Sequence, residues 1–210
     1  MSVLPRVRRA SSADIPAMAA TLGRAFANDP FFAFLAGDAP ERTQRMQDGW
    51  SGILQFASAR LAETYTTDEH AGVAIWLPPG ARGPSVLDGL RIVPAIARLA
   101  GWRRLRLVAD AMGRLEERRR HHVAAPHFYL SALGVEPGRQ GEGIGTALAR
   151  PILDRCDRES IPAYLETATA RNVLLYERLG FDVVEELTLP HSDVRGWLML
   201  RRPAESSALG

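Results

Sequence analysis

The sequence has 210 residues, of which 46% are apolar, enough for one folded domain with a substantial core, and a formal net charge of +2. No window holds the roughly 18 consecutive apolar residues that a membrane span needs, and so small a net charge does not predict a nucleic-acid partner. The single cysteine, Cys156, excludes an internal disulfide, and residues 1–10 lack the apolar core of a signal peptide, so we expect a cytoplasmic protein.

The first half of the chain alternates short strands with amphipathic helices. Residues 11–14 (Ser-Ser-Ala-Asp) offer helix N-caps, and the apolar positions after them recur with helical spacing until Asn-Asp-Pro at 28–30 breaks the pattern. A second helical pattern after Pro40 places Met46 and Trp50 on one face. In chain order we predict a strand at 3–10, a helix to Phe26, a helix from 40 to about 61, and a hairpin of strands at 63–66 and 72–77.

The second half is expected to begin with a helical segment over residues 84–120, broken at Gly101. The pattern then predicts a strand at 127–135, a helix at 144–158, a strand at 162–167, a helix at 170–179 and two closing strands at 181–189 and 193–201. The small, polar residues 203–210 are expected to be a disordered tail. Residues 1–202 are thus predicted to form one domain, in which 84–122 are a helical insertion.

The most informative segment of the sequence is the glycine-rich run at residues 140–145, Gln-Gly-Glu-Gly-Ile-Gly. It follows the predicted strand at 127–135 and opens the predicted helix at 144–158. Glycines at alternate positions leave backbone N–H groups unshielded, and a helix N-terminus adds unpaired donors and about half a positive charge. This combination is typical of a main-chain cradle for a phosphate or pyrophosphate.

Two commoner glycine motifs do not fit this run. A P-loop requires lysine where the sequence has Ile144, and the chain contains no lysine at all. A dinucleotide fingerprint requires a third glycine where the sequence has Thr146. The phosphate-bearing ligand is therefore not predicted to belong to either of these two nucleotide classes.

The run instead resembles the Gln/Arg-x-x-Gly-x-Gly/Ala pyrophosphate loop of the GNAT acetyltransferases, with Gln140, Gly143 and Gly145 in the matching places. A second segment, residues 172–181, resembles the Asn-x-x-x-Tyr-x-x-x-Gly-Phe segment of the same superfamily. Residues 127–202, together with 73–79, are similar to the puromycin N-acetyltransferase group within it. Most of residues 1–60 and 80–125 match no motif, so the resemblance indicates a mechanism rather than a substrate.

The resemblance implies an α+β protein of the GNAT fold, with a mixed, mostly antiparallel sheet of about seven strands flanked by helices and the helical insertion before the fourth strand. It also implies acetyl-CoA as co-substrate, held where the strand at 127–135 splays from the strand at 162–167. The implied contacts are Leu133, Gly134, Val135, Arg139, Gln140, Gly141, Glu142, Gly143, Ile144, Gly145, Thr146, Asn172 and Tyr176. Among them, the Val135 N–H is the expected donor to the acetyl carbonyl. Arg139 is either a charge partner of the pyrophosphate or an ordinary surface arginine.

Acetyl transfer from a thioester to an amine requires two positioned reactants and proton transfers. Tyr176 is the predicted general acid, because the departing thiolate needs a proton, and Asn172 lies one helical turn before it on the same face. Glu166 is a candidate base, since a partly buried carboxylate has a raised pKa, although it could instead orient a neighbouring group. His127 and a water chain without a dedicated base are alternatives. Cys156 is expected to be a small buried hydrophobe rather than an acetylated nucleophile.

The acceptor side of the site is less determined by the sequence. Phe26, Asp29 and Phe31 lie where the resemblance places the acceptor, and aromatic rings beside an acidic residue suit an amine with an apolar body. The same residues could equally form a helix–helix core with an aspartate cap. The arginine-rich stretch at 103–120 is interpreted as a solvated face, and the histidines show no metal-ligand spacing.

We therefore predict an N-acetyltransferase that transfers the acetyl group of acetyl-CoA to a small-molecule amine by direct attack in a ternary complex. It is expected to need no metal, to bind neither nucleic acid nor membrane, and to be a monomer or homodimer. Two alternatives stay open: acetylation of protein or peptide amines, and a non-catalytic acyl-CoA-binding module that keeps the fold. The presence of Tyr176 and Asn172 argues against the second, because binding alone needs no proton donor.

Overall fold

Seven strands form one continuous sheet in the computed structural model, which describes residues 5–37, 41–59, 63–80 and 86–204. The strands are β1 (Val7–Arg9), β2 (Glu63–Thr67), β3 (Gly72–Leu77), β4 (Phe128–Val135), β5 (Ala163–Thr167), β6 (Asp182–Thr188) and β7 (Arg195–Arg201). They lie in the order β1-β2-β3-β4-β5-β7-β6, and every neighbouring pair is antiparallel except β4 and β5. The mixed, mostly antiparallel sheet that the resemblance implies is confirmed.

The helices follow the predicted order with one addition. They are α1 (Ile15–Ala25), α2 (Pro30–Ala36), α3 (Arg42–Ala59), α4 (Val86–Ala100), α5 (Leu105–His122), α6 (Ile144–Glu159) and α7 (Ala170–Arg178), with short 3-10 turns at Ser12–Asp14, Trp102–Arg104 and Pro137–Arg139. The insertion before β4 consists of α4 and α5 and is broken at Gly101, as the sequence predicts. No helix in the described part of the chain is long and apolar enough to cross a membrane.

Helix α2 was not predicted, because seven residues are too few for a helical period to stand out. Asp29 is its N-cap and Pro30 its first residue, which is the sequence signature of a helix start. Predictions that fall on residues 1–4, 38–40, 60–62, 81–85 and 205–210, including most of the predicted tail, lie outside the described residues.

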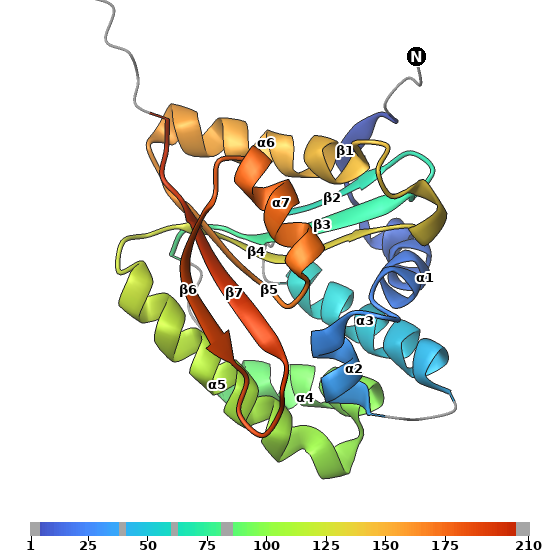
Figure 1. The fold of residues 1–210 in the computed structure, drawn as a ribbon. Helices are drawn as coiled ribbons and strands as arrows, with labels where there is room; N and C mark the ends of the chain where they lie inside the picture. The colour runs from blue at the N-terminus through green and yellow to red at the C-terminus, as the bar shows by residue number, and fades with distance from the viewer. Residues whose placement is uncertain (1–4, 38–40, 60–62, 81–85, 205–210) are drawn as a thin grey trace, which may run out of the picture.

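The two faces of the sheet carry different helices (Figure 1). Alternate residues of β3 show the division, since successive side chains of a strand point to opposite faces. Ala74 and Trp76 pack in the cluster that contains α6 and Tyr176 of α7, whereas Val73 and Ile75 pack with α1 and α3. Helices α2 and α5 cover the part of this second face that lies over β5 and β7.

An irregularity in β4 changes which of its side chains face which helices. The register shift opposite Ile75 and Trp76 of β3 leaves Ser131 of β4 as an extra residue, which is a β-bulge. Beyond the bulge, Leu133 packs on the α6 side and Gly134 faces α1. Because a bulge bends its strand, Ser131 lies where β4 can turn away from β5.

Candidate active site

Strands β4 and β5 run side by side only over a short stretch and then separate. Their parallel pairing joins Phe128 with Ala163, Tyr129 with Tyr164 and Leu130 with Leu165. Within these described strands, β4 continues to Val135 and β5 to Thr167 without further pairing between them. The backbone groups along the separated edges are free to bind an extended ligand. The predicted splay is therefore present.

The glycine-rich loop lies at the end of β4 and begins α6. Gly141 (φ 90°) and Gly143 (φ 82°) have left-handed backbone conformations, which residues with a side chain rarely adopt. Gly143 is the N-cap of α6, so the N–H groups of the first helical turn have no partner inside the helix. The Gln140 amide donates a hydrogen bond to the Val135 carbonyl at 3.2 Å. This bond holds the loop, and with it the helix N-terminus, beside the end of β4.

Gly145 shows how the start of α6 meets the splay. A methyl group built on its Cα would lie 3.6 Å from Leu175 of α7, 3.7 Å from Leu133 and 3.8 Å from Val135. The bare Cα of Gly145 therefore faces the region between the end of β4 and α7. Ile144, in contrast, is buried in the core, so its side chain anchors the helix and only its N–H is available to a ligand.

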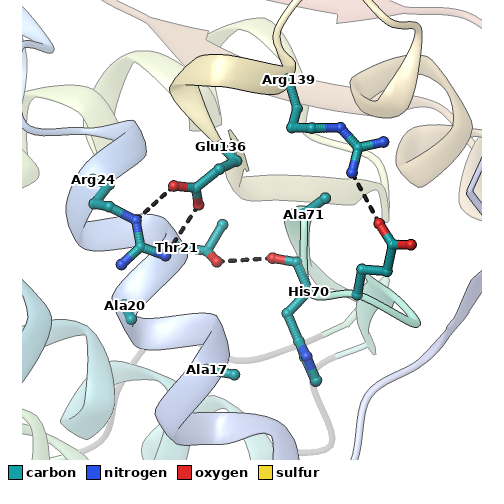
Figure 2. Close-up of a pocket in the computed structure, with 9 residues that line it drawn as sticks. Ala17, Ala20, Thr21, Arg24, His70, Ala71, Glu136 and Arg139 are labelled. Carbon is teal, nitrogen blue, oxygen red and sulfur yellow. Dashed lines mark hydrogen bonds and ion pairs between the residues drawn. The ribbon is translucent and has the colours of Figure 1, made fainter.

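Arg139 is already paired with carboxylates. Its guanidinium donates hydrogen bonds to Glu142 at 2.8 Å and to Glu69 of the β2–β3 turn at 2.9 Å. Figure 2 shows Arg139 near Arg24 and Glu136, which form an ion pair with each other. These three residues help to line a hollow of about 340 Å³. The two bonds of Arg139 use the Nε–H and one Nη–H of the guanidinium, so the remaining donors can contact a pyrophosphate while both bonds persist.

Tyr176 lies in α7 with its ring buried against the core. Its side chain is 6% exposed, and its ring centroid lies 6.0 Å from that of Phe181. Burial, together with the nearby charge of Asp29, raises the pKa of Tyr176, so the phenol stays protonated at neutral pH. Asn172 is half-buried one helical turn earlier, on the same face.

Asp29 connects the acceptor side of the site to α7. One carboxylate oxygen accepts hydrogen bonds from the backbone N–H groups of Phe31, at 3.0 Å, and Phe32, at 3.2 Å. The other accepts a hydrogen bond from the hydroxyl of Thr169, the N-cap of α7, at 3.1 Å. Burial raises the pKa of Asp29, although these bonds oppose the shift. The aspartate cap that was one of two interpretations of this segment is present.

The aromatic side chains on the acceptor side pack mainly against one another. Phe26 lies 4.7 Å from Phe32 and 5.3 Å from Trp50 between ring centroids, and Phe31 meets Phe32 edge-on at 5.4 Å. Phe26 also borders Gly134 of β4, since a methyl group there would come within 3.3 Å of its ring. The helix–helix core is thus formed, and its Phe26 end lies beside the end of β4.

Glu166 lies on the sheet face that α2 and α5 cover, because it is two residues beyond Tyr164, which packs in that cluster. Burial raises the pKa of Glu166 to about 7, against the opposing effects of a hydrogen bond with Tyr129 and the charge of Arg119. A carboxyl with such a pKa is suited to accept a proton near neutral pH. Sequence reasoning missed Tyr129, Arg119 and Thr169 as neighbours of the site, because their proximity depends on the tertiary fold.

The other candidate bases and nucleophiles are less favourably placed. His127 lies directly before β4, and burial lowers its pKa. Burial raises the pKa of the Cys156 thiol to about 12, so this fully buried group stays protonated and inert. Among the described residues, no group of three or more histidine, cysteine, aspartate and glutamate side chains is arranged to hold a metal ion.

The sheet order, the splay after the β4 bulge and the glycine-rich start of α6 together define the GNAT fold. A model described as the acetyltransferase (GNAT) family matches residues 88–181, from α4 through the loop to the segment that holds Tyr176. The chain is 27% identical, over 95% of its length and 84% of the relative, to an uncharacterized N-acetyltransferase of Schizosaccharomyces pombe. These matches show that the chain is similar to GNAT acetyltransferases over residues 88–181 and to one N-acetyltransferase over most of its length.

Solved structures show the same fold at lower identity. A crystal structure described as histone acetyltransferase HPA2 and related acetyltransferase, from Corynebacterium glutamicum, matches with a TM-score of 0.73 and 24% identity, covering 98% of this chain and 99% of that one. The C-terminal condensation domain of Ebony in complex with β-alanyl-dopamine matches with a TM-score of 0.70 and 10% identity, covering 96% and 100%. At these identities the likeness shows the fold alone.

Proposed function

We propose that this protein transfers the acetyl group of acetyl-CoA to a primary amine of a small molecule. The observation that carries the proposal is the splay of β4 from β5, which ends at the glycine-rich N-terminus of α6 and has α7 packed beside it. The match to the GNAT family model and the similarity to an N-acetyltransferase also support acetyl transfer.

The residues at the splay fit coenzyme A as a ligand. The unpaired edge at residues 131–135 offers backbone groups to an extended amide-containing arm, and the free N–H groups at the start of α6 offer a cradle for a pyrophosphate. Gly145 leaves space between these two parts, and Asn172 of α7 is assigned a hydrogen bond to the arm. When bound, acetyl-CoA supplies a thioester whose carbonyl carbon is open to attack by an amine.

Three groups of the protein are each assigned one role in the transfer: the Val135 N–H, Glu166 and Tyr176. The Val135 N–H is assigned to the acetyl carbonyl oxygen, where it stabilises the negative charge that develops during attack. As the amine nitrogen bonds to the acetyl carbon and the carbon–sulfur bond breaks, Glu166 takes a proton from the nitrogen and Tyr176 gives one to the sulfur. The inert thiol of Cys156 supports this direct route over one through an acetylated enzyme.

The acceptor side favours a compact amine. Helices α2 and α5 cover the sheet face that carries Glu166, which leaves less room for a protein surface than an open face would. The similarity of residues 127–202 to the puromycin N-acetyltransferase group makes an aminonucleoside or another antibiotic-like amine the first class to test. A cytoplasmic enzyme that is a monomer or homodimer is part of the same proposal.

Thiol release from acetyl-CoA, measured against a panel of amines, tests the proposal. The panel includes puromycin, simple aromatic and aliphatic amines, and a lysine-containing peptide, and product formation is checked by mass. Because the chain contains no lysine, no lysine side chain of the enzyme consumes acetyl-CoA, and a reaction without added amine measures the thiol released by hydrolysis. We expect turnover of at least one small amine, with equal amounts of thiol and acetylated product.

The same panel separates the alternatives. Turnover of the peptide alone would assign the protein to the peptide-acetylating class and overturn the small-molecule acceptor. Binding of acetyl-CoA, measured by calorimetry, without turnover of any amine or peptide would favour a non-catalytic acyl-CoA-binding module. Absence of acetyl-CoA binding would overturn the proposal altogether.

A further inference from the structure

Glu166 has a defined set of neighbours on the acceptor face, and one of them comes from the helical insertion. Tyr129 of β4 is paired in register with Tyr164 of β5, and their ring centroids lie 6.3 Å apart. Tyr164 and Glu166 are alternate residues of β5 and so point to the same face. The two phenols and the carboxyl therefore share one small region of the sheet, beneath α5.

Arg119 of α5 covers this region. Its guanidinium carbon lies 4.2 Å from the centre of the Tyr129 ring, a cation–π geometry that fixes both groups. The same guanidinium is ion-paired with Glu116 one turn earlier on α5. Arg119 is thereby held from two sides, with its charge directed at the phenol that faces Glu166.

The other charged residues around this region are engaged elsewhere. Arg118 donates a hydrogen bond to Glu185 of β6 at 2.7 Å, and His122 contacts the same carboxylate at 2.6 Å. Arg120 also pairs with Glu116 at 2.8 Å, but its side chain is 74% exposed. On β7, the residue opposite Glu166 is the apolar Leu198. Of the cations on the end of α5, Arg119 is the one whose charge lowers the pKa of Glu166 most.

Two further polar groups border this region: the hydroxyl of Tyr164 and the imidazole of His127, whose ring centroid lies 6.1 Å from that of Tyr164. The Tyr164 side chain is fully buried, and its hydroxyl interacts with the Glu166 carboxyl, whose pKa this interaction lowers as Tyr129 does. The place of this hydroxyl beside Glu166 indicates a polar pocket rather than an ordinary part of the hydrophobic cluster.

We propose that Arg119 and Tyr129 are positioning residues for Glu166. The helical insertion, through Arg119, thus helps to position the base of the reaction. The proposal rests on the proposed function, in which Glu166 receives the proton of the amine. Arg119 fixes the Tyr129 ring, and the Tyr129 hydroxyl and the arginine charge together stabilise the ionised form of Glu166. An insertion that carries no recognised motif thereby contributes to catalysis without contacting the reacting atoms.

The predicted consequence is a shift in the protonation of Glu166. Burial raises the pKa of this carboxyl to about 7, and the Tyr129 and Arg119 interactions oppose the rise, so removing either should raise the pKa further. A nearby opposite charge shifts a carboxyl pKa by about 1–3 units, and we expect about one unit for Arg119→Gln. At pH 7 the ionised fraction then falls from about one half to about one tenth, so kcat/KM should drop about fivefold and recover by about pH 9.

A titration that needs no substrate provides the first test. The Glu166 carboxyl is followed by carbon-13 NMR in protein labelled at glutamate side chains, with Glu166→Gln to assign the signal. We expect its midpoint to rise in Arg119→Gln and in Tyr129→Phe, and to return toward wild type in Arg119→Lys, which keeps the charge. Arg120→Gln is the matched control, because it removes the neighbouring cation of the same ion-pair cluster and should leave the midpoint in place.

Two outcomes would overturn the positioning role: an unchanged Glu166 midpoint in both test variants, or an equal shift in Arg120→Gln. Thermal unfolding of each variant confirms that it is folded before titration. The pH profile of kcat/KM with an accepted amine is the second readout, and a loss of activity equal at all pH values would also contradict the role. If no amine is turned over, the proposed function fails, while the titration still decides the placement of Arg119 and Tyr129.

Discussion

The contact between Gly134 and α1 leads to a quantitative prediction for the substitution Gly134→Ala. The added methyl would lie 2.8 Å from a terminal carbon of Leu22, 3.1 Å from the Cβ of Ala25 and 3.3 Å from the ring of Phe26. Leu22 can rotate away, but the Cβ of Ala25 is fixed to the backbone, so α1 or β4 must shift by a few tenths of an ångström. Overpacking of this kind costs about 1–3 kcal/mol.

For a chain of this size, such a loss lowers the melting temperature by about 2–12 °C. Thermal unfolding followed by circular dichroism, with urea denaturation for the free energy, measures the effect. Gly138→Ala is the matched control, because no atom lies within 4 Å of a methyl group at that position. A melting temperature of Gly134→Ala within about 1 °C of both the wild type and this control would refute the described packing of α1 on β4.

Three further substitutions test other parts of the structure. Tyr176→Phe should lower turnover by at least roughly tenfold with little change in acetyl-CoA binding, since a general acid contributes about 10²–10⁴-fold; unchanged turnover would remove that role. Asp29→Ala loses the cap of α2 and the bond from Thr169, so urea denaturation should show a loss of about 1–2 kcal/mol, whereas Asp29→Asn should retain most of it. Hydrogen bonds to Arg8 and His70 lower the pKa of Asp14 far below its unfolded value. The stability they provide is therefore present above about pH 4 and is lost as the pH falls further, and Asp14→Asn should flatten this acid limb in denaturation curves measured from pH 7 to pH 2.

The order of strands and helices was predictable because the spacing of apolar residues in a long segment indicates whether it is a helix or a strand. The hairpin at 63–77, the break at Gly101 and the strand–loop–helix unit around residues 128–159 were all confirmed. The splay was predictable only through the resemblance, since no local pattern reveals where two strands stop pairing. The bulge at Ser131 was missed for the same reason, because an extra residue in a strand is visible only against its partner.

The surroundings of the candidate site depended on contacts between distant parts of the chain. Arg139 meets Glu69 across the turn between β2 and β3, and Asp29 meets Thr169, which lies 140 residues later. Likewise, Arg119 reaches Tyr129 only because α5 folds back beneath β4. A single sequence encodes such pairs through overall packing, so neither the hydrophobic period nor a short motif could have identified them.

The narrow junction in the sheet has a consequence for stability. Strands β1–β4 and β5–β7 form two antiparallel ladders, and only three residue pairs join one to the other. An extended ligand in the gap would form backbone hydrogen bonds with both β4 and β5, as an added strand would. Ligand binding would then stabilise the association of β1–β4 with β5–β7. The sheet should therefore become more rigid as more of the protein binds ligand. Slower amide hydrogen exchange along β4 and β5 would then report how tightly such a ligand is bound.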